Sequence, residues 1–226
     1  MRSSRFGSSQ RSHAYRHTLL VLALGLTASA PARGGDDHQY VGVKKCNTCH
    51  GKELMGDQVA TWRKGPHTRA FATLTDEASQ QIANERGITR PPQEAQECLR
   101  CHSTVFGVTP TQMAYDLALS DGVQCESCHG PGRDYRKKKI MSDRDNAVAK
   151  GLWDPNALLC ARCHNEASPT FDPARYTLPD GSHAGFDYDQ AVARIAHEIP
   201  AEVRGHYIEL EKKQKEAERK RREAGG

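Results

Sequence analysis

Apolar residues recur at helical spacing in several short segments of the chain, and no strand pattern of any length is visible. Glycine and proline end most of these segments, as they do at helix termini. The predicted helices cover residues 51–65, 75–87, 91–102, 109–122 and 186–199, followed by a charged helix over 201–222. Residues 133–151 are predicted to be a polar connector, and residues 169–185 to be irregular. The pattern therefore predicts a mostly α fold with little or no sheet.

Two of the predicted helices have recognisable ends or faces. Thr75 is expected to cap the helix 75–87, and Gly87 to end it. In the helix 186–199, one apolar stripe is expected, with His197 close to it; its members are Val192, Ile195 and Ile199.

The first 32 residues have the pattern of a secretory signal. A basic segment without acidic residues precedes a short apolar run, which ends in small residues with cleavage expected after Ala32. The apolar run, 19–26, is too short to span a bilayer, so a retained membrane anchor is the disfavoured alternative. We therefore expect export to the periplasm and no stable membrane anchor. The expected organisation is a signal at 1–32, a flexible segment at 33–40, one folded domain at 41–200 and a charged C-terminal helix or tail at 201–226.

Composition limits both the core and the partners. Only 37% of the 226 residues are hydrophobic and 6% are aromatic, which allows a modest apolar core. The signal holds four of the 32 basic residues and none of the 28 acidic residues, so the rest of the chain is formally neutral. The basic excess therefore gives no support to nucleic acid binding.

All eight cysteines belong to four copies of the pattern C-x-x-C-H. The cysteines are Cys46, Cys49, Cys98, Cys101, Cys125, Cys128, Cys160 and Cys163, and the histidines that follow the pairs are His50, His102, His129 and His164. This pattern is the attachment signature of c-type haem. The two thiols add to the two vinyl groups of one porphyrin, and the histidine binds the iron.

Disulfides, zinc sites and thiol redox pairs also use closely spaced cysteines. None of them requires a histidine after every pair, and here no cysteine is left over. The sequence therefore predicts four covalently bound haem c groups, whose porphyrins form the core that apolar side chains do not supply. Haems held in so short a chain must lie close together, which predicts an electron relay.

Three segments resemble the tetrahaem cytochrome c-554 family: CNTCH with TWRKGPHTRAFATL, CESCHGPGR with an aromatic residue and Arg after it, and the helix that contains AHEI. The resemblance covers about residues 40–199. It implies a mostly helical fold around four haems in close stacked pairs, and electron transfer in the periplasm. The well-studied members accept electrons from hydroxylamine oxidoreductase, a multihaem enzyme. In the family, three haems have histidine on both faces and one is five-coordinate.

The resemblance also implies two distal iron ligands, His67 and His197, of which His197 is expected to serve the fourth haem. Where the family has a third distal histidine, this sequence has Lys139, so the first haem lacks an assigned sixth ligand. Met141 can coordinate iron and is one candidate.

In the family, a loop similar to residues 176–179 covers the open face of the second haem. His183 follows this loop and is expected to cap that haem or none. His38 and His206 are expected to be surface residues, so the sixth ligand of the second haem also stays open.

An electron carrier is the preferred function, because distal histidines are present and no acid–base cluster accompanies the second motif. One alternative is a haem enzyme that reduces a small nitrogen oxide at a five-coordinate haem. Another is a subunit of a conductive filament, in which neighbouring subunits donate histidines to each other's haems. The expected partners of a carrier are an electron donor, such as a multihaem oxidoreductase, and a downstream acceptor protein.

Overall fold

The computed structural model describes residues 38–224 of the chain. The chain divides into two units, 1–34 and 35–226, and the described residues all belong to the second. The predicted signal and nearly all of the predicted flexible segment 33–40 lie outside the described residues. None of the helices in the described part is long and apolar enough to cross a membrane.

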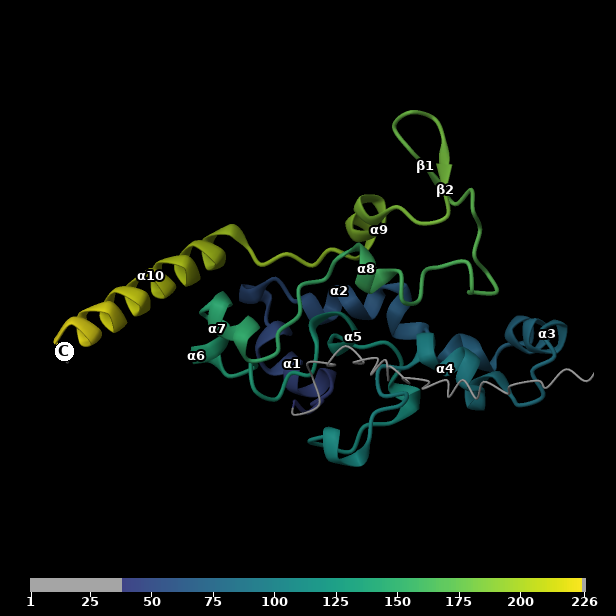
Figure 1. Cartoon of the computed structure of the whole chain (residues 1–226), viewed down its shortest axis with the longest axis horizontal. Helices are drawn as coiled ribbons and strands as arrows, with labels where there is room; N and C mark the ends of the chain where they lie inside the picture. The colour runs from purple at the N-terminus through teal and green to yellow at the C-terminus, as the bar shows by residue number, and fades with distance from the viewer. Residues whose placement is uncertain (1–37, 225–226) are drawn as a thin grey trace, which may run out of the picture. The chain divides into compact units, whose positions relative to one another are not determined.

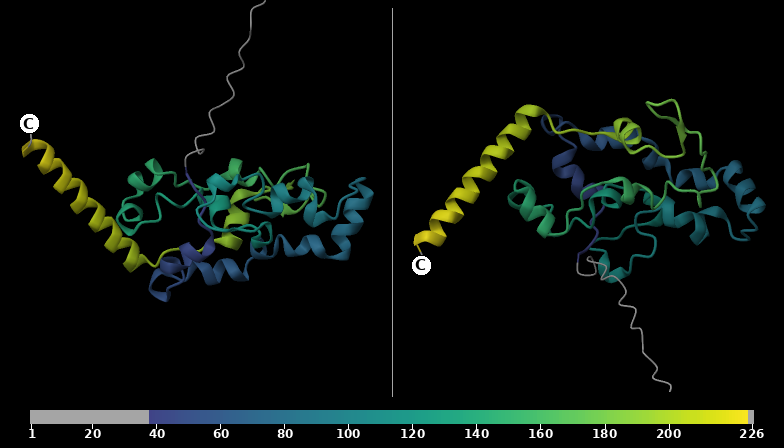
Figure 2. Two further views of the ribbon diagram at one scale, coloured as in Figure 1. Left: turned by 90° about the horizontal axis from the view of Figure 1, so that it is seen from below. Right: turned by 45° about the horizontal axis from the view of Figure 1, so that its top comes forward.

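The described residues form short helices joined by turns (Figure 1). The α-helices are α1 (Val43–His50), α2 (Gln58–Lys64), α3 (Glu77–Glu85), α4 (Gln96–His102), α5 (Glu126–His129), α6 (Lys138–Met141), α7 (Arg144–Ala149), α8 (Ala157–Cys160), α9 (Tyr188–Ile195) and α10 (Ala201–Ala224). The 3-10 helices are η1 (Glu53–Met55), η2 (Pro66–Arg69), η3 (Ala72–Thr75), η4 (Pro92–Glu94), η5 (Pro110–Gln112) and η6 (Leu119–Asp121). Helices α1 and α2 lie side by side, as do α6 and α7 (Figures 1 and 2). The prediction of a mostly α fold is confirmed for this part of the chain.

A two-stranded antiparallel sheet is formed by β1 (Tyr176–Thr177) and β2 (His183–Ala184). Tyr176 pairs with Ala184, and Thr177 pairs with His183. This hairpin lies inside the segment 169–185, which was predicted to be irregular and is irregular elsewhere. The strands are too short to give a sequence signal of their own.

The predicted helix over 109–122 is wrong. Only η5 and η6 form there, because the backbone between them pairs with a distant segment. The amide of Tyr40 donates to the carbonyl oxygen of Gln112 at 2.8 Å, and the amide of Ala114 donates to the carbonyl oxygen of Tyr40 at 2.9 Å. A continuous helix would need the carbonyl of Gln112 and the amide of Ala114 for its own hydrogen bonds. The pairing with Tyr40 therefore replaces the helix that the local periodicity predicted.

The segment 133–151 was predicted to be a polar connector, with no helix assigned to it. It forms α6 and α7. The side chain of Asp143 caps α7 by accepting a hydrogen bond from the amide of Asn146 at 3.0 Å. The helix buries Ala147 almost completely.

Two predicted helix ends are displaced. Asp76, rather than Thr75, caps α3, because its side chain accepts a hydrogen bond from the amide of Ser79 at 2.8 Å. Helix α9 ends at Ile195, and Ala196 is no longer helical (φ −56°, ψ 137°). His197 therefore lies just beyond this helix rather than on it.

The buried carboxylate of Glu126 joins the first described residues to α5. The side chain of Glu126 is 1% exposed and accepts hydrogen bonds from three amides. These come from Val41 (2.9 Å), Gly42 (2.8 Å) and Gly132 (2.6 Å). Burial raises the pKa of this carboxyl, and the backbone donors partly oppose that effect. The contacts fix the start of α1 beside the third C-x-x-C-H motif.

Candidate functional site

Each C-x-x-C-H motif occupies about one helical turn. The first lies in α1, the second in α4 and the third around α5. The fourth begins at the end of α8 and continues the turn, since the amides of Cys163 and His164 donate to the carbonyl oxygen of Cys160 at 3.1 and 2.9 Å. Residues three apart lie on one face of a helix, so the two thiols of each motif point to the same side. This is the arrangement that attachment to two vinyl groups requires.

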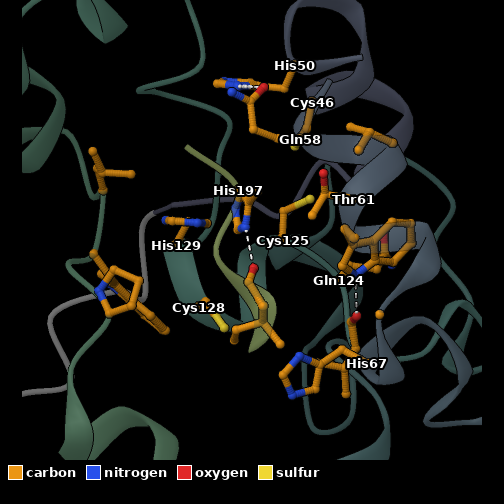
Figure 3. A pocket seen from close by; sticks show the side chains of 18 of the residues that line it. Cys46, His50, Gln58, Thr61, His67, Gln124, Cys125, Cys128, His129 and His197 are labelled. Carbon is orange, nitrogen blue, oxygen red and sulfur yellow. Dashed lines mark hydrogen bonds between the residues drawn. The ribbon is translucent and has the colours of Figure 1, made fainter. Parts of the chain in front are cut away.

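A cavity of about 330 Å³ lies between α1, α2, α5 and the segment after α9 (Figure 3). It brings together side chains from the first and third motifs and from distant parts of the chain. Among the residues that line it are Cys46, His50, Trp62, His67, Cys125, Cys128, His129, Met141, Trp153 and His197. The sequence-predicted distal residues His67 and His197 therefore reach the same cavity as two of the attachment motifs.

His197 lies beside His129 of the third motif. Their ring centres are 6.0 Å apart and the rings are perpendicular. Nδ1 of His197 donates a hydrogen bond to the carbonyl oxygen of Ile195 at 2.9 Å, which leaves Nε2 free for a metal (Figure 3). His197 was expected to serve the fourth motif, and the structure places it at the third instead.

His67 lies beside His164 of the fourth motif, with the ring centres 6.1 Å apart. The other neighbour of His164 is Phe186, whose ring stacks on it at 5.4 Å. Sequence reasoning missed Phe186, because an aromatic residue at a helix start carries no signal for a histidine far away.

The spacing of both histidine pairs fits two ligands of one metal ion. Bonds between a metal and a histidine nitrogen are about 2 Å long, so imidazoles on opposite sides of an ion have ring centres about 6 Å apart. Both observed separations match this value. Among the described residues, no group of three or more His, Cys, Asp or Glu is arranged to hold a metal ion without a porphyrin. The donor set thus fits haem with histidine on both faces at the third and fourth motifs.

Hydrogen bonds orient the histidines of the other two motifs. Nδ1 of His50 lies 3.3 Å from Oε1 of Gln58, and Nδ1 of His102 donates to the carbonyl oxygen of Ala70 at 2.5 Å. In each case Nε2 stays available for a metal. Neither partner was predicted from the sequence.

Burial keeps several of these imidazoles neutral, which is the form that binds metal. It lowers the pKa of His129 to about 4, and it also lowers the pKa of His50, His67 and His164. Nε2 of Gln124, at the wall of the same cavity, is buried and has no hydrogen-bond partner among the described residues. A bound polar group would satisfy this donor.

The four motifs adjoin one another in space in an order that differs from the sequence. A hydrogen bond between the thiols of Cys46 and Cys125 links the first motif to the third and raises the pKa of Cys46. A second thiol pair, Cys101 with Cys163, links the second motif to the fourth, and its hydrogen bond lowers the pKa of Cys101 to about 6.

The third and fourth motifs are linked as well. Burial raises the pKa of Cys128 to about 11, and the nearby thiol of Cys160 adds to the effect. The spatial order is therefore first, third, fourth, second.

The surroundings of the second motif are more open and more basic. A second cavity, of about 590 Å³, is lined by Cys98 together with Arg86, Arg90 and Arg100. The loop that was expected to cover this motif packs elsewhere: the ring of Tyr176 contacts Phe186 edge to face at 6.3 Å. The hairpin thus adjoins the fourth motif.

The remaining sequence-predicted candidates separate clearly. Lys139 and His183 are exposed, and Nδ1 of His183 lies 3.5 Å from Oγ1 of Thr177. Nδ1 of His38 pairs with a carboxylate oxygen of Asp134 at 2.6 Å. Met141, which the sequence offered as a candidate sixth ligand, lines the first cavity.

Comparisons with known proteins find similarity to c-type cytochromes. A family model described as "Cytochrome c554 and c-prime" matches residues 45–130, which include the first three motifs and His67. A curated relative named cytochrome c-554, from Nitrosomonas europaea, is 29% identical over 175 residues, which cover 66% of this chain and 71% of the relative. No solved structure matches the chain.

Proposed function

Because this chain belongs to the cytochrome c-554 family and so binds haem c covalently, we propose that it carries four haem c groups and relays electrons between redox partners in the periplasm. Haem c supplies an iron that changes between the ferric and ferrous states, so each bound group takes up or releases one electron. The sequence supplies four attachment motifs for these groups.

The observation that carries the proposal is the contiguity of the four motifs. Thiols of the first and third motifs adjoin, as do those of the third and fourth and those of the fourth and second. Cofactors attached at these thiols lie close to one another, which supports electron exchange along the series. A haem site that is far from every other haem could carry only one electron and could not pass it along a series.

The side chains of the site favour a carrier. His129 with His197, and His164 with His67, are spaced to hold an iron from both faces, and a filled coordination sphere leaves no place for a substrate there. Such sites change little on reduction, because the fold holds the ligands and Nδ1 of His197 donates to the carbonyl oxygen of Ile195.

The periplasmic location rests on the sequence of residues 1–32. A signal of this kind directs export, and haem is attached to C-x-x-C-H motifs outside the cytoplasmic membrane. The partners that fit this location are a donor protein and an acceptor protein that each expose a redox centre.

Counting electrons tests the relay. The full chain is produced in a host that attaches haem c, reduced completely, and mixed with an excess of a small oxidised c-type cytochrome. We expect four electrons to leave each chain, since every site connects to a neighbour. A protein that delivers fewer than four, or that keeps part of its haem reduced, contradicts the proposal.

A further inference from the structure

Two potential iron ligands of the first cavity belong to neither histidine pair. The imidazole and thioether side chains of its lining are those of His50, His67, His129, His197 and Met141. Tyr135 and Asp154 also line the cavity, but the hydroxyl of Tyr135 donates to the carbonyl oxygen of Gly130 at 2.8 Å, and Asp154 pairs with Arg144. His129 faces His197, and His67 faces His164. The side chains that remain are the imidazole of the first motif, His50, and the thioether of Met141.

The hydrogen bond of His50 leaves its other ring nitrogen for a metal. Nδ1 lies 3.3 Å from Oε1 of Gln58, so Nε2 stays available. Cys46 of the same motif lines the same cavity. A sixth ligand for this site must come from a side chain that reaches the cavity.

Helix α6 presents Met141 and not Lys139 to the cavity. Met141 is half-buried and lines the cavity, whereas Lys139 is exposed. Residues two apart point to different sides of a helix, so both cannot face the same space. The amide of Met141 donates to the carbonyl oxygen of Lys137 at 2.9 Å, which closes this turn of α6, and the adjacent Ser142 is buried.

We propose that the sulfur of Met141 is the sixth ligand of the iron at the first motif, so that this haem is held by His50 and Met141. The inference rests on the proposed function, because it requires a haem at this motif. The sulfur donates a lone pair to the iron, and no bond is broken. Ligation by His and Met raises the reduction potential above that given by two histidines. An electron that enters the relay therefore resides mainly on the haem of the first motif, which lies next to the third motif.

The test uses the complete holoprotein and three variants: Met141→Ala, Met141→His and Lys139→Ala. We expect the ferric wild-type protein to show the long-wavelength charge-transfer band of sulfur-ligated haem. In Met141→Ala one low-spin iron should become high-spin. In Met141→His all irons that were low-spin should stay so, the sulfur band should vanish, and the highest reduction potential should fall. Lys139→Ala is the matched control and should leave the band and the potentials unchanged.

Three results would overturn the inference: no sulfur band in the wild-type protein, a band that survives in Met141→His, or a loss of low-spin iron in Lys139→Ala. The wild-type spectrum decides the matter even if Met141→Ala does not fold. The haem content of the wild-type protein separates this failure from that of the proposed function. Four haems without a sulfur band reject only the methionine ligand, whereas fewer than four haems reject the relay.

Discussion

At the scale of residues, the site consists of histidines brought together from distant positions. The motif histidines were predictable because each follows its cysteines directly. The distal role of His67 and His197 was predicted from the family resemblance, but not the motif that each faces. That depends on where η2, which contains His67, and the segment after α9 lie in the fold. His197 lies beside His129 rather than beside His164.

Replacing either distal histidine should change one iron and leave haem attachment intact. In His67→Ala the fourth site loses a ligand, and in His197→Ala the third site does, so each variant should gain one high-spin iron at unchanged haem content. Electron paramagnetic resonance of the oxidised protein counts the two spin states.

The exposed His183 provides the control for these variants. His183→Ala should keep the wild-type spectrum. If His67→Ala and His197→Ala also keep it, then neither histidine is a ligand and the pairing inferred from the ring distances is wrong.

Glu126 should contribute to stability through its three amide donors. In Glu126→Gln one acceptor oxygen becomes an amide nitrogen, which leaves buried N–H groups without a partner. An unsatisfied buried polar group costs about 1–3 kcal/mol, so the free energy of unfolding should fall by that amount. Denaturant titration of the holoprotein measures it.

The same substitution at the exposed Glu97 is the matched control, and surface changes usually stay within about 0.5 kcal/mol. Equal stability of Glu126→Gln and Glu97→Gln would show that the buried carboxylate does not hold the start of α1 in place.

At the scale of elements, the sequence predicted those helices that follow from the local periodicity of polar and apolar residues. Helices α3, α4, α9 and α10 lie within the predicted ranges or within a few residues of them. The helix predicted over 109–122 is absent because Tyr40 takes up its backbone groups, and no local pattern reports a partner that far away. The residue that caps α7, Asp143, is visible in the sequence, but the charged residues around it indicated only a polar connector.

The contact between α7 and α10 should depend on pH. Nζ of Lys215 donates to a carboxylate oxygen of Asp145 at 2.9 Å, and this hydrogen bond lowers the pKa of Asp145. A carboxyl with a lowered pKa stabilises the contact above its ordinary pKa, and the contribution is lost as the pH falls through the lowered value. Spin labels on α7 and α10 should therefore report a wider distance distribution in acid.

Asp145→Asn separates this pair from other effects of acid. The variant should show the wide distribution already at neutral pH, and added salt should widen the wild-type distribution because both groups are exposed. A distribution in the wild-type protein that does not respond to pH or salt would contradict a role for the ion pair.

At the scale of the whole molecule, the apolar core is thin and the cysteine motifs lie next to one another. Among residues 38–224, few apolar side chains are buried, and Val41, Val59 and Leu99 are three of them. The low hydrophobic content predicted this, and it also indicated that a cofactor fills the interior. The spatial order of the motifs could not be predicted, because it results from packing between helices far apart in the sequence.

The central claim is that one chain carries four covalently attached haems, and the mass of the intact protein tests it most directly. The full chain is produced in a host that attaches haem c. The purified protein is extracted with acidified acetone to remove unattached haem, and its mass is measured by mass spectrometry. The account predicts the mass of a chain that begins at Arg33 plus four haems, one for each motif. A mass that corresponds to fewer haems, or to a chain whose cysteines are joined as disulfides, would contradict it.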